Sequence, residues 1–180
     1  MEDADIFAND LINEAKRFLE KVRKEKDVHG REAYLHAALL IAFAALEAHI
    51  NSIVDDFSFR KDLTPLEKSI LFEKELSLKE GEFKVTEGLK MYRLEDRIEF
   101  IVKKFSGKRL RKDERWWTKL KSGLHLRNKL THPKGKELIT EETAEDSIYA
   151  IISLLQVLYR AVYRRDYPLK RTGLDSSMNF

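Results

Sequence analysis

One stretch of the chain, from about Arg31 to Phe57, constrains the fold more than any other. Large apolar residues recur there with the spacing of a helix, at Leu35, Leu39, Phe43, Leu46, Ile50, Ile53 and Phe57. Alanines fill much of the remaining helix surface, at Ala33, Ala37, Ala38, Ala42, Ala44, Ala45 and Ala48. A helix that is apolar nearly all round lies at the centre of a bundle or pairs on two sides.

Most of the remaining chain also has helical periodicity. Apolar residues three or four apart predict further helices over about 4–24, 94–105, 116–131 and 140–165. Gly107 and Pro133 are expected to end the second and third of these. The pattern predicts an all-α fold, a single bundle of five or six helices.

One further helix has a clear N-terminus, but the conformation of the segment after it is open. Thr64, Pro65 and Glu67 form the pattern of a capped helix N-terminus, and we expect that helix to end near Leu76. The segment Ser77–Gly88 carries two glycines and alternating residues. A short hairpin and a loop are both compatible with it.

Composition narrows the class of protein. A chain of 180 residues fits one domain over 1–180, in which we expect 166–180 to form a loose tail. The absence of cysteine removes disulfides and thiolate chemistry and fits a reducing compartment. The acidic start is unlike a secretory signal, and the longest apolar stretch, Ala37–Leu46, is too short to span a bilayer. We expect a cytoplasmic protein that does not contact a membrane.

Charge is balanced overall but uneven locally. The chain has 34 Lys and Arg against 31 Asp and Glu, a net +3, which argues against binding driven by charge alone. The densest basic run includes Lys108, Arg109 and Arg111 and precedes Trp116 and Trp117. Basic residues beside aromatics suit an RNA backbone with unstacked bases. A solvated loop with core tryptophans is the alternative.

Polar residues interrupt two apolar helix faces. Arg127 continues the stripe of Trp116, Leu120 and Leu124, and a neighbouring stripe carries His125, Asn128 and His132. Glu47 lies on an otherwise apolar face of the helix over 31–57. Because a buried guanidinium needs an anion, we expect Glu47 to meet Arg127 or His132 across the two helices.

These residue types match the needs of RNA cleavage without a metal. His132 can move protons near neutral pH, Arg127 can stabilise a charged phosphorane, and Asn128 can hold a phosphate or ribose hydroxyl. Glu47 would orient the site. The histidines and carboxylates lack a recognisable ligand spacing, so we expect no metal and no cofactor. The alternative for His132 is a helix C-terminal residue favoured by the helix dipole.

The segment Arg127–His132, with sequence RNKLTH, resembles the motif of the HEPN family: arginine, four to six residues, then histidine. The segment Ala44–Asn51 is similar to an early helix of several HEPN groups. The resemblance implies helical bundles that dimerise and place two motifs in one cleft. It also implies ribonucleases of toxin–antitoxin, CRISPR or antiviral systems, which leave 2′,3′-cyclic phosphate ends. Lys129 and Lys134, within and just after the motif, would contact the RNA.

The resemblance leaves partner and activity open. In one toxin group a nucleotidyltransferase partner modifies a tyrosine two residues after the motif histidine, a position that Lys134 occupies here. An antitoxin is a further possible partner. Some HEPN proteins have no activity and bind nucleotides or proteins. The sequence therefore supports two hypotheses. One is a homodimeric ribonuclease. The other is a non-catalytic helical module that binds a protein or nucleotide through the same cleft, with the apolar helix over 31–57 as its interface.

Overall fold

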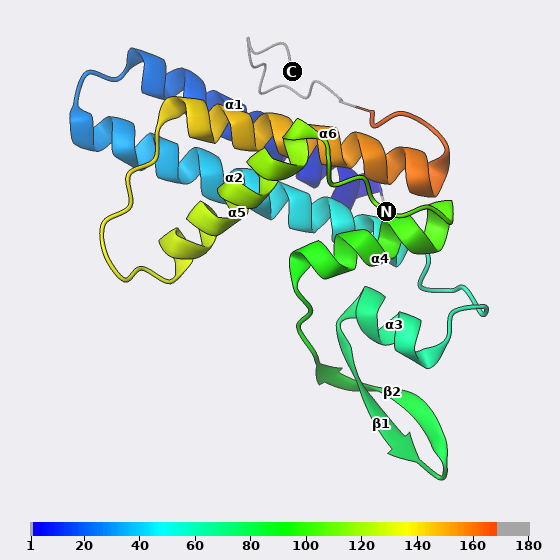
Figure 1. The fold of residues 1–180 in the computed structure, drawn as a ribbon. Helices are drawn as coiled ribbons and strands as arrows, with labels where there is room; N and C mark the ends of the chain where they lie inside the picture. The colour runs from blue at the N-terminus through cyan, green and yellow to red at the C-terminus, as the bar shows by residue number, and fades with distance from the viewer. Residues whose placement is uncertain (1, 169–180) are drawn as a thin grey trace.

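The chain folds as a mostly helical molecule with one small antiparallel sheet. The computed structural model describes residues 2–168, with side chains from residue 6 onward. The described elements, in chain order (Figure 1), are α1 (Glu2–Lys24), α2 (Val28–Asp55), α3 (Pro65–Phe72), β1 (Lys74–Lys79), β2 (Glu82–Leu89), α4 (Leu94–Ser106), α5 (Arg115–Thr131) and α6 (Glu141–Tyr163). The predicted helical bundle is confirmed in this coarse form, and the two strands add to it.

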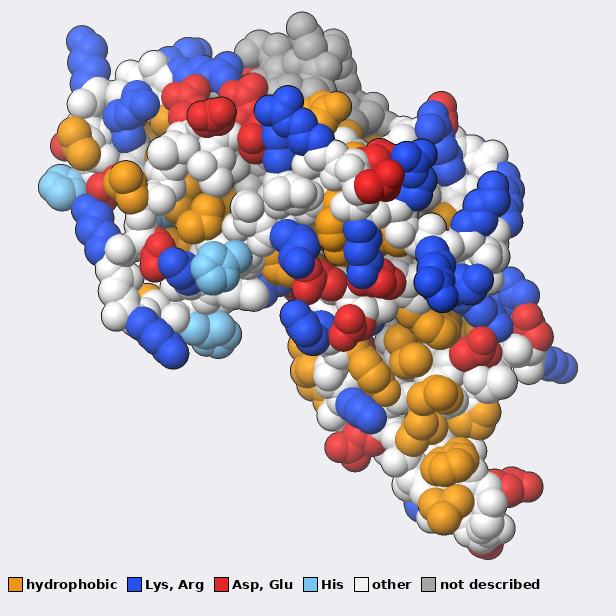
Figure 2. Space-filling view, in the orientation of Figure 1, with side chains coloured by type: hydrophobic (Ala, Val, Ile, Leu, Met, Phe, Trp, Pro, Cys, Tyr) orange, Lys and Arg blue, Asp and Glu red, His pale blue; other side chains and the backbone are white. Residues whose placement is uncertain are grey.

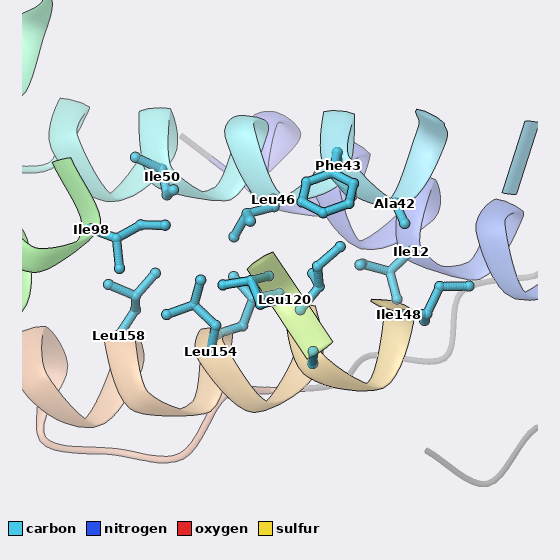
Figure 3. Close-up of a cluster of buried hydrophobic side chains, with 14 of the residues drawn as sticks. Ile12, Ala42, Phe43, Leu46, Ile50, Ile98, Leu120, Ile148, Leu154 and Leu158 are labelled. Atoms are coloured by element: carbon cyan, nitrogen blue, oxygen red, sulfur yellow. The ribbon is translucent and has the colours of Figure 1, made fainter. Parts of the chain in front are cut away.

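The central helix is α2, which packs against α1, α5 and α6. Phe43, Leu46 and Ile50 are at most 1% exposed. Figure 3 shows them facing Leu154 and Leu158 of α6. Most of the apolar surface of α2 is therefore buried inside the molecule, which removes the reason for expecting this helix to supply an interface.

The same helix passes a simple test for membrane spans. By length and composition alone, an 18-residue window of α2 is apolar enough to cross a bilayer, and 61% of that window is buried inside the molecule. Such burial is typical of a core helix.

Helix α5 lies close against α6 and α2 because of a glycine. A Cβ added at Gly123 would come within 2.4 Å of Ser147 Oγ and 3.3 Å of Phe43. Trp116 and Leu120 of α5 are also buried in the core. A side chain at position 123 would push α5 outward, so this glycine sets the distance between the helices.

The predicted helix ends are mostly confirmed. Helix α4 ends before Gly107, which has a φ of 72° and suits a residue without Cβ. Thr140 caps α6 by accepting a hydrogen bond from the Thr143 amide. Helix α5 ends at Thr131, two residues before Pro133.

The helix that begins at Pro65 ends earlier than expected. It stops at Phe72 rather than near Leu76, because Glu73 takes a left-handed conformation with a φ of 53°. Lys74–Lys79 then pairs with β2, so the open alternative resolves as a hairpin. Its turn residues Glu80 and Gly81 both have positive φ, as a two-residue hairpin turn with the right twist requires.

The hairpin projects from the bundle and exposes apolar side chains. Its main contacts with other elements are with α3, and it extends away from the long helices (Figure 1). Leu78 pairs with Phe83, and both are 64% exposed. Figure 2 shows a continuous run of apolar side chains over this part of the molecule.

Part of the expected loose tail packs into the core. Tyr167 is only 7% exposed. Its hydroxyl donates a hydrogen bond to Asn9 Oδ1 of α1 at 2.7 Å and lies 3.0 Å from His49 Nε2 of α2. The expectation of a loose tail is therefore wrong at this residue, while positions 169–180 lie outside the described residues.

Candidate functional site

The central residue of the candidate site is Arg127, near the carboxyl-terminal end of α5. Arg127 follows Leu120 and Leu124 along α5, and its side chain is 22% exposed. The guanidinium lies 5.7 Å from the centre of the Phe43 ring, a cation–π arrangement. Its Nη2 donates a hydrogen bond to Glu47 Oε1 of α2. Of the two partners expected for Glu47, the structure confirms Arg127. No hydrogen bond joins Glu47 and His132 among the described residues.

The other residues of the motif face solvent. Asn128 and His132 are both exposed. The backbone N–H of His132 donates to the Asn128 carbonyl at 3.0 Å, which places His132 at the helix C-cap. No hydrogen bond of either side chain is found among the described residues. Histidine side chains lie at the surface over the carboxyl-terminal end of α5 in Figure 2. Both groups can therefore reach a ligand from solution.

A polar pocket of about 270 Å³ adjoins Arg127 and Asn128. Helix α2 contributes Glu47 and Asn51, and the segment that joins the hairpin to α4 contributes Tyr92 and Arg93. His132 does not line it. The surface is hollowed between this end of α5 and the projecting hairpin (Figure 2). All six charged residues that line the pocket are arginine or glutamate, and they come from distant parts of the chain, so tertiary packing assembles the pocket.

Arg97 of α4 holds one wall of this pocket, and the sequence analysis missed it. Its guanidinium donates to Glu73 Oε2 at 2.8 Å, to Asn51 Oδ1 at 3.2 Å and to the Leu71 carbonyl at 2.9 Å. Burial lowers the pKa of Arg97, and the charges of Glu73 and Glu47 counteract that shift. The signal was present, because Arg97 interrupts the apolar face formed by Leu94, Ile98 and Ile101.

Glu47 therefore sits between two cations. It bonds Arg127 directly and interacts with Arg97 through its charge. A carboxylate that is held in this way fixes the orientation of the Arg127 fork. Arginine has five N–H donors, so the others stay available for a phosphate.

The expected RNA-contacting residues divide between two places. Lys129 forms an ion pair with Glu137 at 2.9 Å, and Lys134 is exposed beyond the helix end. Lys108, Arg109 and Arg111 lie before the other end of α5. With a rise of about 1.5 Å per residue, the helix separates the two groups by roughly 25 Å. The structure does not bring these three residues to the Arg127 pocket.

Tryptophan burial decides one open alternative. Trp116 is 8% exposed and Trp117 is 5% exposed, so both are core residues rather than open stacking platforms. Within residues 6–168, no group of three His, Asp or Glu side chains is arranged to hold a metal ion.

Comparisons of the chain with protein-family models, with curated proteins and with solved structures found no match.

Proposed function

We propose that this chain is a metal-independent endoribonuclease of HEPN type. The observation that carries the proposal is the arrangement around Arg127. The motif arginine is anchored by Glu47 at the edge of a polar pocket that Asn128 also lines, and His132 is exposed five residues further on, at the end of the same helix. An anchored cation, an amide and an accessible imidazole on one helix end suit a phosphodiester substrate.

The proposed reaction is an intramolecular transesterification, in which the 2′-hydroxyl attacks the phosphate on the 3′-oxygen of the same ribose. The 2′-oxygen attacks phosphorus and loses its proton, the bond from phosphorus to the 5′-oxygen breaks, and that oxygen gains a proton. The products are a 2′,3′-cyclic phosphate and a 5′-hydroxyl. His132 transfers one of the two protons, which contributes about 100- to 10,000-fold to the rate. The free N–H groups of Arg127 stabilise the charge on the phosphorane.

A single imidazole serves only one of the two proton transfers at a time. A second copy of the chain, with its own exposed motif against the same RNA, would supply the other imidazole. The homodimer is therefore part of the proposal. The open position of His132 at the end of α5 supports it, because nothing in the described fold covers that end.

The test is cleavage of a labelled structured RNA in EDTA, with analysis of the ends. Wild type is expected to cleave and leave cyclic phosphates, and His132→Ala is expected to lose activity by at least about 100-fold. The matched control is His29→Ala, which removes an exposed histidine at the start of α2, away from the motif. Equal cleavage by wild type and His132→Ala would overturn the proposed role of His132.

The proposed role in the cell is defence or a toxin-like effect, with an antitoxin or nucleotidyltransferase as possible partner. Expression of an active ribonuclease slows its host. Expression of wild type is therefore expected to reduce growth, and Arg127→Ala is expected to restore it at equal protein level. Growth inhibition that persists in Arg127→Ala would contradict this role.

A second candidate function rests on a different observation. The hairpin exposes the apolar pair Leu78 and Phe83, and large exposed apolar patches mark interaction sites. The alternative is a non-catalytic helical module that binds a protein partner through this face. Loss of partner binding with unchanged folding in hairpin variants would favour this candidate over the ribonuclease.

A further inference from the structure

A second pocket lies at the opposite end of α5 from the motif. Its volume is about 300 Å³, and it is formed by the loop between α4 and α5 together with the carboxyl-terminal parts of α4 and α6. Leu110, Trp116 and Val157 contribute an apolar floor. This volume is at the small end of the range of about 300–1,000 Å³ for ligand pockets, so it suits one ring system rather than a helix of a partner protein.

The rim of this pocket is basic. It carries Lys108, Arg109, Arg111, Arg160 and Arg164. Arg111 is paired with Asp113 and Glu114, and Arg160 with Asp166.

Three cations of the rim keep an uncompensated charge. Arg164 donates to the Phe105 carbonyl, which leaves its charge in place, and Lys108 and Arg109 form no ion pair within residues 6–168. Figure 2 shows Lys and Arg side chains gathered on the side of the molecule where α4 and α6 end. The pocket therefore selects a ligand that combines an anionic group with an apolar ring.

We propose that this pocket binds one unpaired nucleotide of single-stranded RNA. The base would enter over Leu110 and Val157, where the 8% of Trp116 that stays exposed completes the floor, and the flanking phosphates would lie against Lys108 and Arg109. The proposal rests on the proposed function, since it concerns the same RNA. It assigns to these basic residues a role in holding the substrate away from the reacting bond.

Position favours RNA over an acidic peptide with a bulky apolar side chain. The pocket and the motif lie at the two ends of one helix, roughly 25 Å apart by the helical rise. Lys121, His125 and Asn128 form an exposed polar stripe along α5 that leads to His132. A strand of several nucleotides can follow this stripe and engage both ends. A peptide in the pocket would gain nothing from that stripe.

The experiment measures binding of a fluorescent 2′-O-methyl oligonucleotide of about 12 nucleotides by anisotropy. This probe lacks the attacking hydroxyl, so binding is read without cleavage. Lys108→Glu with Arg109→Glu is expected to weaken binding at least about 10-fold and to reduce the salt slope by about 1.4, as the loss of two phosphate contacts requires. Val157→Phe fills the pocket with a ring and is also expected to weaken binding.

The control is Lys21→Glu with Lys24→Glu, which makes the same change in net charge on exposed residues at the end of α1. It is expected to bind like wild type. If the Lys108→Glu, Arg109→Glu variant binds the oligonucleotide as tightly as the control variant does, the proposal is overturned and the acidic peptide is left as the occupant. If that variant binds weakly but Val157→Phe binds like wild type, with an unchanged melting temperature, the RNA contacts only the basic rim. That outcome also overturns the proposal. Failure of the ribonuclease proposal is separate, because it appears as absence of cleavage with binding intact.

Discussion

At the scale of single residues, buried arginines decide how the helices meet. Arg97 is 5% exposed and donates hydrogen bonds to Glu73, Asn51 and the Leu71 carbonyl, while its Nε has no partner within the described residues. A buried guanidinium costs several kcal/mol of desolvation, which carboxylate and carbonyl partners offset only when the geometry is good. Arg97 therefore contributes more to the specific position of α4 than to net stability.

The first prediction concerns removal of that cation. Arg97→Ala leaves the mostly buried Glu73 carboxylate without its cation and removes the donor that Asn51 Oδ1 and the Leu71 carbonyl share. We expect the free energy of unfolding in urea to fall by about 3–5 kcal/mol. Adding Glu73→Gln to Arg97→Ala is expected to recover part of the loss. Arg93→Ala, at an exposed ion pair with Glu95, is expected to change stability by less than about 1 kcal/mol. Equal losses in the two single variants would refute this account.

The same physics explains which contacts the sequence could reveal. The pairing of Glu47 with Arg127 was predictable because each residue interrupts an apolar stripe and each needs an opposite charge. Arg97 carried the same signal, but its partner Glu73 lies at a helix end where no periodicity marks it. Tyr167 follows the last helix without any pattern, so its burial depends on tertiary contacts that local sequence does not show.

At the scale of elements, the helices were predictable, whereas the sequence left the hairpin as one of two alternatives. A helix is stabilised by contacts three and four residues apart, so its periodicity is visible locally. The start of β1 at Lys74 depends instead on pairing with Leu89, fifteen positions along the chain. The left-handed Glu73 that ends α3 is likewise unmarked in the sequence, because glycine and asparagine are the usual signals there.

The next prediction tests whether the hairpin face is free. Leu78→Lys with Phe83→Glu replaces an exposed apolar cross-strand pair by an opposite-charge pair, which keeps the pairing favourable. We expect the free energy of unfolding to change by less than about 0.5 kcal/mol. Light scattering at micromolar concentration is expected to show less self-association than wild type.

The contrast for the hairpin variant is Leu71→Ala, in α3 directly beneath it. Leu71 is 1% exposed, so its truncation is expected to cost about 2–5 kcal/mol. A comparable loss in the Leu78 and Phe83 variant would mean that the hairpin face is covered in the folded molecule. If wild type self-associates and the Leu78→Lys, Phe83→Glu variant scatters light to the same extent, the interface between copies lies outside the hairpin.

At the scale of the whole molecule, one tyrosine ties the end of the described chain to its beginning. The Tyr167 hydroxyl reaches Asn9 of α1 and His49 of α2, 158 and 118 residues away in sequence. The ring stands edge-on to His49 with the ring centres 5.2 Å apart. Contacts of this separation form only when α1, α2 and α6 are all in place, so they belong to global rather than local stability.

Tyr167→Phe keeps the ring and removes only the hydroxyl. The loss of hydrogen bonds to two buried groups is expected to lower the free energy of unfolding by about 1–3 kcal/mol, with an unchanged denaturant slope. Tyr34→Phe is the control, because no hydrogen bond of its hydroxyl is found among the described residues. If Tyr167→Phe left the urea midpoint unchanged but made the chain near Tyr167 sensitive to protease, the hydrogen bonds of Tyr167 would stabilise only that segment. A shift of the whole transition would instead place Tyr167 within the cooperative core that also supports α5 and the Arg127 site.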